Sequence, residues 1–465
     1  MYPLVPDFRE RLGLPCPEDR KLPAWVRAKP LGVFEGLKRD AWASQELAGA
    51  EVGNRANAKR LVFSAARIAQ SPHTSTNQAF GADTAAQLGW FRFVDNPKVT
   101  PQGILAGHRD CTLMRARVFR IVLFVMDTMT VSLPGKVKAT SLEGDFSVFG
   151  YYAHTTIAVE PEQELFLGVV DATFRGRRQG GKGPGRLPPD ERESAVWRQH
   201  ARRVGEAAAH MPGTLSVLVG DREDDALLFI HECIELGCVR LVIRARTDLV
   251  LPEESEGLFP LMAHTEPCGT MKVKLGRTSE RRDCAGNAVA RAYPETVVEV
   301  DVAFRRATLA PPPEKPEAGP LEVVCVAAVE RGKPKRDERV KWILLTTVDL
   351  ENAEDAMTVV RYYERRWLIE EMHGILKKDC CDIESLAYRT FARLVTCMPS
   401  TYLQHRHALR EQSRIRVASG WKNSYGRNAS ATWNNARSRR RRNENALPRS
   451  SAAMLLGRCE RHGTP

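Results

Sequence analysis

Three acidic residues far apart in the sequence, Asp127, Asp221 and Glu370, have the side chains and the settings of a metal site. Asp127 follows the run VFRIVLFVM and Asp221 follows LSVLVG, and each run predicts a buried strand that ends at the aspartate. Two strand-end aspartates and a glutamate on a helix suit two Mg²⁺ ions about 3.5–4 Å apart at a phosphodiester, with Asp127 bridging both ions. Carboxylate oxygens favour Mg²⁺ or Mn²⁺ over softer metals.

Taken one at a time, the two aspartates have ordinary structural explanations. Asp127 could cap the turn that begins at Thr128. Asp221 could be the N-cap of a helix that opens with REDDALL, whose acids would sit in the first turn. The metal-site hypothesis therefore depends on the three acids together and not on any one of them.

The segment YYERRWLIEEMHGILKK, residues 362–378, predicts a helix with one apolar and one charged face. At about 100° per residue, Tyr363, Arg366, Glu370 and Lys377 fall on one stripe about 60° wide, apart from the apolar residues. The stripe could be a solvated surface with an i,i+4 pair between Arg366 and Glu370, worth about 0.3–0.5 kcal/mol. It could instead be half of an active site.

The rest of the pattern is that of an α/β protein, with elements that would hold these residues. Residues 42–111 have helical periodicity, and strands and helices alternate from residue 118 to about 251. Residues 252–340 are rich in Pro, Gly and short alternating runs, which predicts a β-rich insertion. A long helix from about Ala353 carries the charged stripe. Residues 1–41 are Pro-rich and irregular.

The charge, the cysteines and the apolar runs of the chain limit the classes of protein to which it can belong. The chain has 465 residues and a net charge of +12, but 14 of its 69 basic and only 3 of its 57 acidic residues lie in residues 398–465. The charge therefore belongs to this tail, which is either a disordered basic DNA-binding segment or an out-of-frame translation product. The 11 cysteines have no zinc-site spacing. No membrane-spanning run or signal peptide is visible, so we expect a cytoplasmic protein.

Together the motifs VMDTMTVSL, VGDREDD and Y-x2-R-x3-E-x6-K resemble the bacterial DDE cut-and-paste transposases of the insertion-sequence-four family. The segments RWLIEEMH, VKWILLTT and NRANAKRLV are similar to the same family. The likeness covers roughly residues 42–398. Each motif alone is weak, but the set is specific.

The resemblance implies an RNase H-like mixed-sheet core in two parts, residues 113–251 and 341–397, separated by the insertion at 252–340. It also implies a helical domain at 42–112 that binds transposon-end DNA. Asp127, Asp221 and Glu370 would be the catalytic, metal-binding triad for two Mg²⁺ ions, for which Mn²⁺ can substitute. The protein would cut double-stranded DNA at the terminal inverted repeats through a hairpin intermediate and join it to target DNA, as a nucleoid-associated homodimer.

The resemblance also implies roles for residues around the triad. Tyr363, Arg366 and Lys377 would hold the 5′-phosphate of the strand that folds back, for which a hydroxyl, a bidentate guanidinium and a point charge are suited. Trp342 would stack on a flipped base, worth about 1–3 kcal/mol. Arg244 corresponds to an arginine that contacts the hairpin. Otherwise Trp342 would be a core residue and Arg244 an ordinary surface residue.

In the N-terminal domain, basic residues opposite the apolar stripe of one helix would contact end DNA; these are Arg55, Lys59 and Arg60. A surface charge run is the alternative explanation. The chain departs from the family pattern at Asn57, where relatives have arginine, and at Gly374, where close relatives often have lysine. Nothing in residues 398–465 resembles the C-terminal helices through which the family dimerises.

Three hypotheses follow. The first is an active Mg²⁺-dependent transposase, favoured by the intact triad. The second is an inactive remnant that binds transposon ends without completing transposition, favoured by the tail. The third is a nuclease with an RNase H fold unrelated to transposition, which the Tyr363, Arg366 and Lys377 set disfavours.

Overall fold

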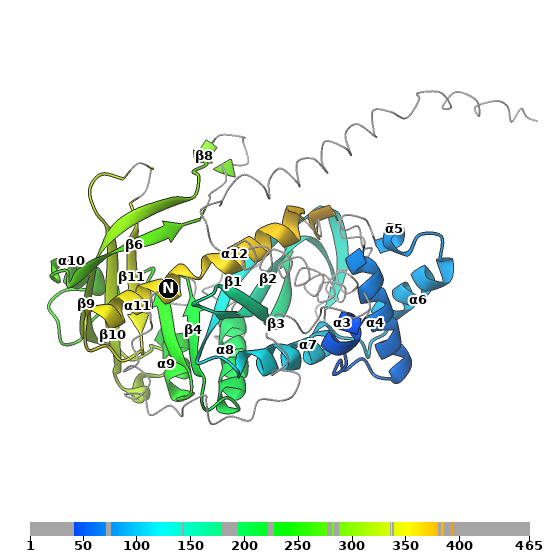
Figure 1. The fold of residues 1–465 in the computed structure, drawn as a ribbon, viewed down its shortest axis with the longest axis horizontal. Coiled ribbons are helices and arrows are strands. Elements are labelled where there is room, and N and C mark those ends of the chain that lie inside the picture. Colours follow the sequence, from blue (N-terminus) through cyan, green and yellow to red (C-terminus); the bar gives the residue numbers. More distant parts are fainter. Residues whose placement is uncertain are drawn as a thin grey trace, which may run out of the picture. The chain divides into compact units, whose positions relative to one another are not determined.

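The computed structural model describes residues 41–70, 76–141, 144–178, 194–221, 227–276, 281–282, 288–334, 336, 339–379, 383–385 and 393. The expectations for residues 1–40 and for the tail 398–465 lie outside the described residues. Where the chain is described, it is a mixed α/β structure built on one large sheet (Figure 1). No helix within these ranges is both long enough and apolar enough to cross a membrane.

The large sheet has nine strands in the order β3-β2-β1-β4-β5-β11-β10-β9-β6. Their bounds are β1 Ile121–Ser141, β2 Gly144–Glu160, β3 Leu165–Arg178, β4 Leu215–Gly220, β5 Arg240–Arg244, β6 Gly269–Leu275, β9 Thr296–Leu309, β10 Leu321–Glu330 and β11 Lys341–Thr346. β4 pairs in parallel with β1 and with β5, and the other neighbours are antiparallel. The short strands β7 Arg281–Arg282 and β8 Ala288–Ala290 pair separately. Most strands of the 252–340 region thus extend the sheet that contains β1 and β4.

Helices precede, connect and cover the strands. Those before the sheet are α3 Ala41–Glu46, α4 Arg55–Gln70, α5 Thr76–Phe80, α6 Thr84–Val94 and α7 Pro101–Ala116. Those within and after it are α8 Ser194–Ala209, α9 Leu227–Glu235, α10 Leu258–His264, α11 Ala353–Glu364 and α12 Trp367–Gly374, with short turns η3 Pro316–Ala318, η4 Ile375–Asp379 and η5 Ile383–Ser385. α8 and α9 are the crossovers that the parallel pairs β1–β4 and β4–β5 require.

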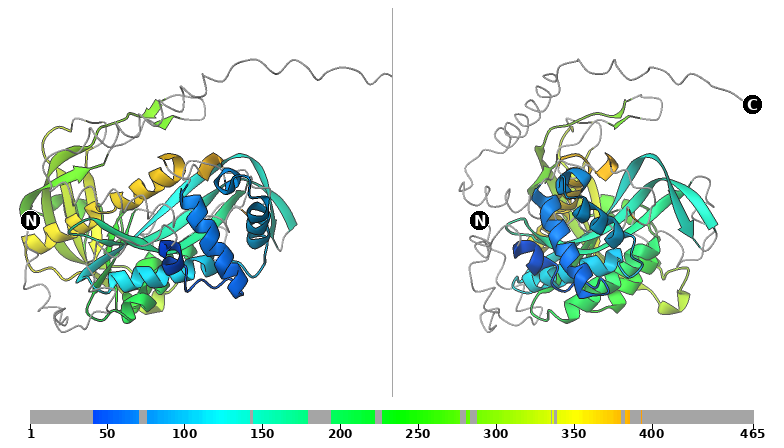
Figure 2. Two further views of the ribbon diagram at one scale, coloured as in Figure 1. Left: turned by 45° about the vertical axis from the view of Figure 1, so that its right-hand side comes forward. Right: turned by 90° about the vertical axis from the view of Figure 1, so that its right-hand side faces the viewer.

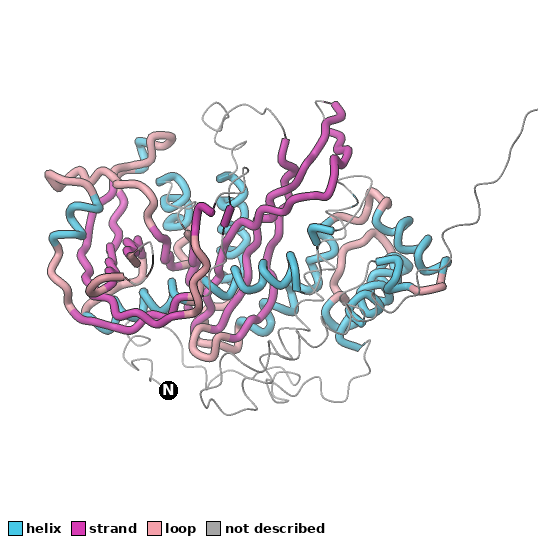
Figure 3. The backbone as a smooth tube through the Cα atoms, turned by 90° about the horizontal axis from the view of Figure 1, so that it is seen from above, coloured by secondary structure: helices cyan, strands magenta, loops and turns pink. Residues whose placement is uncertain are grey.

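The sheet is covered on both faces, so alternate residues of a central strand enter different cores. In β1, Leu123 and Val125 pack in the core that includes α11 and α12, whereas Val122 and Phe124 pack in the core that includes α8 and α9. Figure 3 shows the strands with helices on either side of them. A strand buried on both faces reads as a continuous apolar run, which is the pattern of residues 121–126.

The prediction that the first strand ends at Asp127 is wrong. β1 continues to Ser141, because residues 123–132 pair with β2 from Val159 back to Gly150. What ends near Asp127 is the pairing with β4, whose last register pair is Val125 with Val219. Asp127 therefore lies inside a strand, just beyond the carboxyl end of its parallel neighbour.

The single long helix predicted from Ala353 is also interrupted. α11 ends at Glu364 and α12 begins at Trp367, and at the junction Leu368 and Ile369 donate backbone hydrogen bonds three residues back instead of four. The side chain of Arg365 reaches from this junction to the β2–β3 turn, donating to the Pro161 carbonyl at 2.9 Å. This tertiary contact accounts for a break that the helical periodicity does not predict.

The helix α7 packs along the edge strand β3 (Figure 2). Gln102 donates to the carbonyl of Ala172 at 2.9 Å, Arg109 to that of Val170 at 2.7 Å, and Arg115 to that of Leu167 at 2.7 Å. Side chains thus satisfy the backbone groups of an edge that would otherwise be open to another strand.

Close packing of α7 against β3 explains one glycine. Gly168 has φ of +148°, and a Cβ there would lie 2.1 Å from the hydroxyl of Thr112 on α7. Beside it, the buried His108 accepts a hydrogen bond from the Val169 N–H at 3.0 Å and donates to the Glu46 carboxylate at 2.8 Å. These roles require a neutral imidazole, and burial together with Arg115 holds the pKa of His108 well below its ordinary value.

Two more buried histidines lie between the sheet and α8. Burial lowers the pKa of His154 to about 3 and that of His200 to about 4. His200 is bonded at one ring nitrogen to the Thr156 hydroxyl (2.8 Å) and at the other to the Thr173 hydroxyl (3.0 Å), so both nitrogens are satisfied without a charge.

These histidines predict a loss of stability in acid. An unfolded histidine has a pKa of about 6.5, and His108, His154 and His200 have lower values when folded, so the unfolded state binds more protons below pH 6.5. Their contribution is fully present above that pH and is lost as the pH falls. Between pH 7 and pH 5, the free energy of unfolding should drop by about 2 kcal/mol for His154 and by a similar amount for His200, and His108 should change it in the same direction.

Urea unfolding of wild type and His200→Gln at pH 7, 6 and 5 measures the effect. The variant should show a pH dependence shallower by about 2 kcal/mol over this range, whatever its stability at pH 7. His264→Gln removes an exposed histidine and serves as the control for the substitution itself. Equal slopes for wild type and His200→Gln would contradict the assignment.

Candidate active site

Register and side-chain alternation place the predicted acids together. Val125 of β1 is paired with Val219 of β4, so Asp127 and Asp221 lie two residues further along, at the same level of the sheet. Both share the odd-numbered face of Val125 and Val219, which is the face that α11 and α12 cover. Glu370 lies on α12, which packs against β1. Three parts of the chain that are far apart in sequence thus contribute to one place.

The guanidinium of Arg366 lies among the three carboxylates. Its Nη1 is 3.8 Å from Asp127 Oδ1, and its Nη2 is 3.7 Å from Asp221 Oδ2. Nη2 also donates to Glu370 Oε1 in the i,i+4 pair. The Arg366 side chain is only 15% exposed, compared with 54% for Glu370, so this is a partly buried cluster and not a solvated surface pair.

Further donors surround the two aspartates. Tyr363 donates from its hydroxyl to Asp221 Oδ1 at 2.9 Å, and Arg244 Nη1 lies 3.9 Å from the same oxygen. Asp127 Oδ2 lies 3.5 Å from Nδ1 of His373. Each aspartate therefore faces Arg366 and at least one other donor.

The electrostatics keep the cluster charged. Burial by itself raises the pKa of the Asp127 carboxyl, but His373 and Arg366 outweigh burial and hold that pKa below its ordinary value. Burial and the charge of Asp221 raise the pKa of Tyr363, so its hydroxyl stays protonated and remains a donor. Burial alone would lower the pKa of Arg366, but Glu370 and the other acidic neighbours outweigh burial and raise that pKa above its ordinary value. The guanidinium therefore stays cationic.

Of the remaining predicted residues of the core, Trp342 and Arg244 contact members of the cluster. Trp342 of β11 is half-buried and meets the Tyr363 ring edge-on, with centroids 4.9 Å apart. Arg244 is the last residue of β5, and its Nη2 donates to the Lys341 carbonyl at 3.5 Å. Lys377 lies in the π-helical turn η4, with a half-buried side chain, so the regular α-helical angle predicted for it does not apply.

His373 was missed by the sequence analysis. It is 6% exposed, contacts Asp127 through Nδ1, and its Nε2 has no hydrogen-bond partner among the described residues. The available signal was its position three residues after Glu370, on a neighbouring part of the helix surface. The exposed Gly374 follows directly, and α12 gives way there to the π turn.

The donor set suits a divalent metal in its chemistry, since Asp127, Asp221 and Glu370 offer hard carboxylate oxygens and already surround one cation. Their present arrangement is closed around Arg366. Across the described ranges, no group of three or more His, Cys, Asp or Glu residues is spaced to hold a metal ion directly. Binding of a metal would therefore require Arg366 to move.

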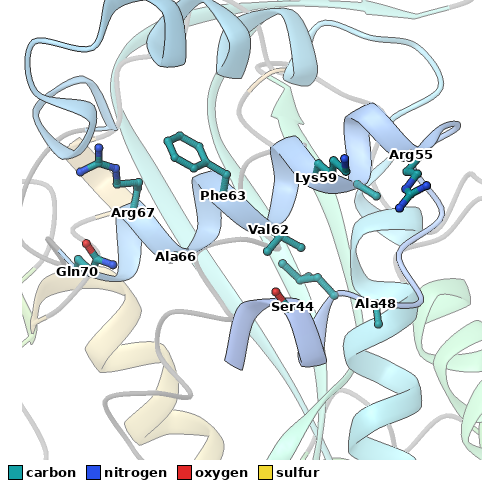
Figure 4. A pocket seen from close by; sticks show the side chains of 11 residues that line it. Ser44, Ala48, Arg55, Lys59, Val62, Phe63, Ala66, Arg67 and Gln70 are labelled. Atoms are coloured by element: carbon teal, nitrogen blue, oxygen red, sulfur yellow. The ribbon is translucent and has the colours of Figure 1, made fainter. Parts of the chain in front are cut away.

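A second candidate surface is a groove of about 940 Å³ between α3 and α4, whose lining contains three cations and no carboxylate. Arg55 and Lys59 lie toward one end of it, and Arg67 lies toward the other (Figure 4). Phe63, 40% exposed, stands between them on the same helix. The groove is a basic surface with an accessible aromatic ring.

The predicted DNA-contacting residues differ in their surroundings. Arg55 and Lys59 are exposed in the groove. Arg60 is half-buried and packs over Gly89 of α6, where an added Cβ would lie 2.5 Å from its Cζ. Asn57, at a position where arginine was expected, donates to the Val52 carbonyl at 2.7 Å and so supports the start of its own helix.

A search against protein-family models finds no match to this chain.

Two adjacent tyrosines give a test of the cluster. Tyr363→Phe removes the hydroxyl that donates to Asp221 but keeps the ring against Trp342. It should lower the free energy of unfolding at pH 7 by about 1 kcal/mol, because Asp221 is partly solvated and regains water. Urea unfolding measures the difference.

Tyr362→Phe is the matched control. The Tyr362 hydroxyl is buried and has no hydrogen-bond partner among the described residues. Removing it should leave stability within about 0.5 kcal/mol of wild type or raise it. A larger loss for Tyr362→Phe than for Tyr363→Phe would refute the assigned hydrogen bond.

Proposed function

We propose that this protein is a DNA transposase that binds the ends of its own mobile element, cuts them through a hairpin intermediate and joins them to target DNA. The convergence of Asp127, Asp221 and Glu370 on one guanidinium carries the proposal. The family resemblance supplies the reaction class. The mixed sheet, with one aspartate on β1 and the other directly after the parallel strand β4, is compatible with the RNase H-like core that the resemblance implies.

Mg²⁺ is the proposed cofactor, with two ions held by Asp127, Asp221 and Glu370, and Mn²⁺ is expected to substitute. When bound, the ions would activate the attacking water or 3′-hydroxyl and stabilise the leaving oxygen. The protein's own part is to fix the three carboxylates on β1, directly after β4, and on α12. His373 would orient Asp127, and Arg244 would lie beside Asp221.

The 5′-phosphate of the folded-back strand would bind to donors at the same place. Arg366 offers a planar pair of N–H groups, and the protonated Tyr363 hydroxyl offers a third donor. Lys377 would add a point charge. Trp342, half-buried beside Tyr363, would stack on a flipped base.

The groove on α4 would hold end DNA. It presents Arg55, Lys59 and Arg67 without a carboxylate in its lining, and such surfaces bind phosphates through counterion release. The partners are therefore double-stranded terminal repeats and target DNA, inside the bacterial cytoplasm at the nucleoid. Pairing of two ends requires a homodimer.

A second candidate is a transposase remnant that binds transposon ends without cutting them. The observation that favours it is the closed cluster, in which Arg366 holds all three acids. The two candidates share the α4 surface and differ at the acids, so one pair of measurements separates them.

Excision of the native element, driven in cells by this protein from a separate plasmid, tests catalysis. Glu370→Gln, Asp127→Asn and Asp221→Asn should each lower excision by at least about 10²–10³-fold, since each removes a ligand of the proposed ions. Glu322→Gln, which removes an exposed carboxylate on β10, should excise as wild type does. Excision by Glu370→Gln at the wild-type level would refute the triad. No excision by wild type, with end DNA still bound in a gel shift, would leave the remnant.

DNA binding by α4 has its own test. The double variant Arg55→Gln, Lys59→Gln should weaken binding to end DNA and lower the slope of log K against log salt by about one unit for each lost phosphate contact. Fluorescence anisotropy over a salt series measures this slope. Arg306→Gln removes an exposed arginine on β9 and should change neither quantity. An unchanged slope in the double variant would exclude this face as the DNA-binding surface.

A further inference from the structure

Arg366 occupies the space that a metal ion would need. Its guanidinium lies within 3.8 Å of carboxylate oxygens from both aspartates and contacts Glu370. A carboxylate oxygen that faces a guanidinium at this distance cannot also face a metal ion in the same direction. In the structure described, the three acids therefore already have a cation.

The same guanidinium is the group proposed to hold a DNA phosphate. Both of its terminal nitrogens, Nη1 and Nη2, face carboxylates. Bidentate phosphate recognition uses a pair of these N–H groups. Arg366 therefore cannot serve the three acids and a phosphate fully at the same time.

We propose that Arg366 is an internal counter-ion, which neutralises the three carboxylates in the free protein and releases them to divalent metal ions when it turns to a DNA phosphate. The inference rests on the proposed function. A DNA phosphate that binds Arg366 would remove it from the carboxylates, which the metal ions need. Metal ions that bind the carboxylates would in turn free Arg366 for the phosphate. Metal and DNA phosphate would then bind with positive coupling, and by thermodynamic linkage the coupling is equal in both directions.

The surroundings of Arg366 suit such an exchange. It sits at the junction of α11 and α12, where the regular helical bonding is interrupted. Its Cζ lies 6.0 Å from the centre of the Tyr363 ring, so the ring lies beside the guanidinium. The aspartates keep other donors when Arg366 leaves, since Asp221 retains Tyr363 and Asp127 retains His373. The carboxylates would thus stay in place for an incoming ion.

Titration of the full-length protein with MnCl₂, without DNA, tests the first half of the inference. Bound Mn²⁺ is measured by calorimetry and by the loss of the free-ion electron paramagnetic resonance signal. Arg366→Gln removes the internal cation and should bind Mn²⁺ at least tenfold more tightly than wild type. Arg366→Lys keeps a cation and should stay close to wild type.

Two further variants serve as controls. Arg361→Gln removes a guanidinium from α11 that pairs with Glu354, away from the three acids, and should bind Mn²⁺ as wild type does. Adding Asp127→Asn to Arg366→Gln should abolish the gained affinity, because it removes a ligand. Circular dichroism and urea unfolding identify any variant that does not fold, and if Arg366→Gln does not fold, Arg366→Met, which also removes the cation, takes its place in both titrations.

Repeating the titration with a 5′-phosphorylated duplex of the element's terminal repeat tests the second half. The duplex should raise the Mn²⁺ affinity of wild type at least tenfold. In Arg366→Gln it should raise the affinity by less than threefold, since the counter-ion is already absent. Equal coupling in both proteins would overturn the inference.

Failure of the inference differs from failure of the proposed function. If Asp127→Asn weakens Mn²⁺ binding but Arg366→Gln does not strengthen it, the acids are metal ligands and Arg366 is no counter-ion. If Asp127→Asn and Glu370→Gln leave Mn²⁺ binding unchanged, the acids bind no metal, and the proposed function fails together with the inference.

Discussion

A central sheet covered by helices on both faces constrains the rest of the structure, because a charge beside its inner strands is only partly solvated. Asp127 lies on such a strand and Asp221 directly follows one, so neighbours stabilise their negative charges. Arg366, Tyr363 and His373 meet them, all from the helical layer above. The aspartates and the residues at and near the α11–α12 junction therefore stabilise each other's partly buried polar groups.

The sequence predicts most element types because the signals are local. The apolar run before Asp127 predicts a buried strand, and in the structure its alternate residues enter the two cores on either face of the sheet. The extension of β1 past Asp127 was not predictable, because pairing with β2 sustains it and not any preference of its own residues. The break between α11 and α12 depends on the reach of Arg365 to Pro161, about two hundred positions away in sequence. The role of His373 likewise appears only when α12 is placed over β1.

The residues of the charged stripe in the 362–378 segment differ in how deeply they are buried. Tyr363 and Arg366 are largely buried against the sheet, whereas Glu370 is half open to solvent. A helical stripe predicted from spacing alone assigns equal exposure to all its members, so it cannot separate a surface ion pair from a buried cluster. The burial of each side chain, and not its angular position on the helix, distinguishes a surface ion pair from a buried cluster here. Arg366 is the member that faces all three carboxylates.

The joint between α7 and β3 has a consequence for how the protein can change over time. Three bonds from α7 end on main-chain carbonyls of β3, at Leu167, Val170 and Ala172, and every amino acid supplies such a carbonyl. Substitutions at these three positions can therefore accumulate without removing the bonds, provided the strand stays extended, whereas Gly168 among them leaves no room for a side chain. The long polar side chains of α7 have no such freedom. The attachment of the helical region to the sheet thus depends on the side chains of α7 and, on β3, mainly on the main chain and on Gly168.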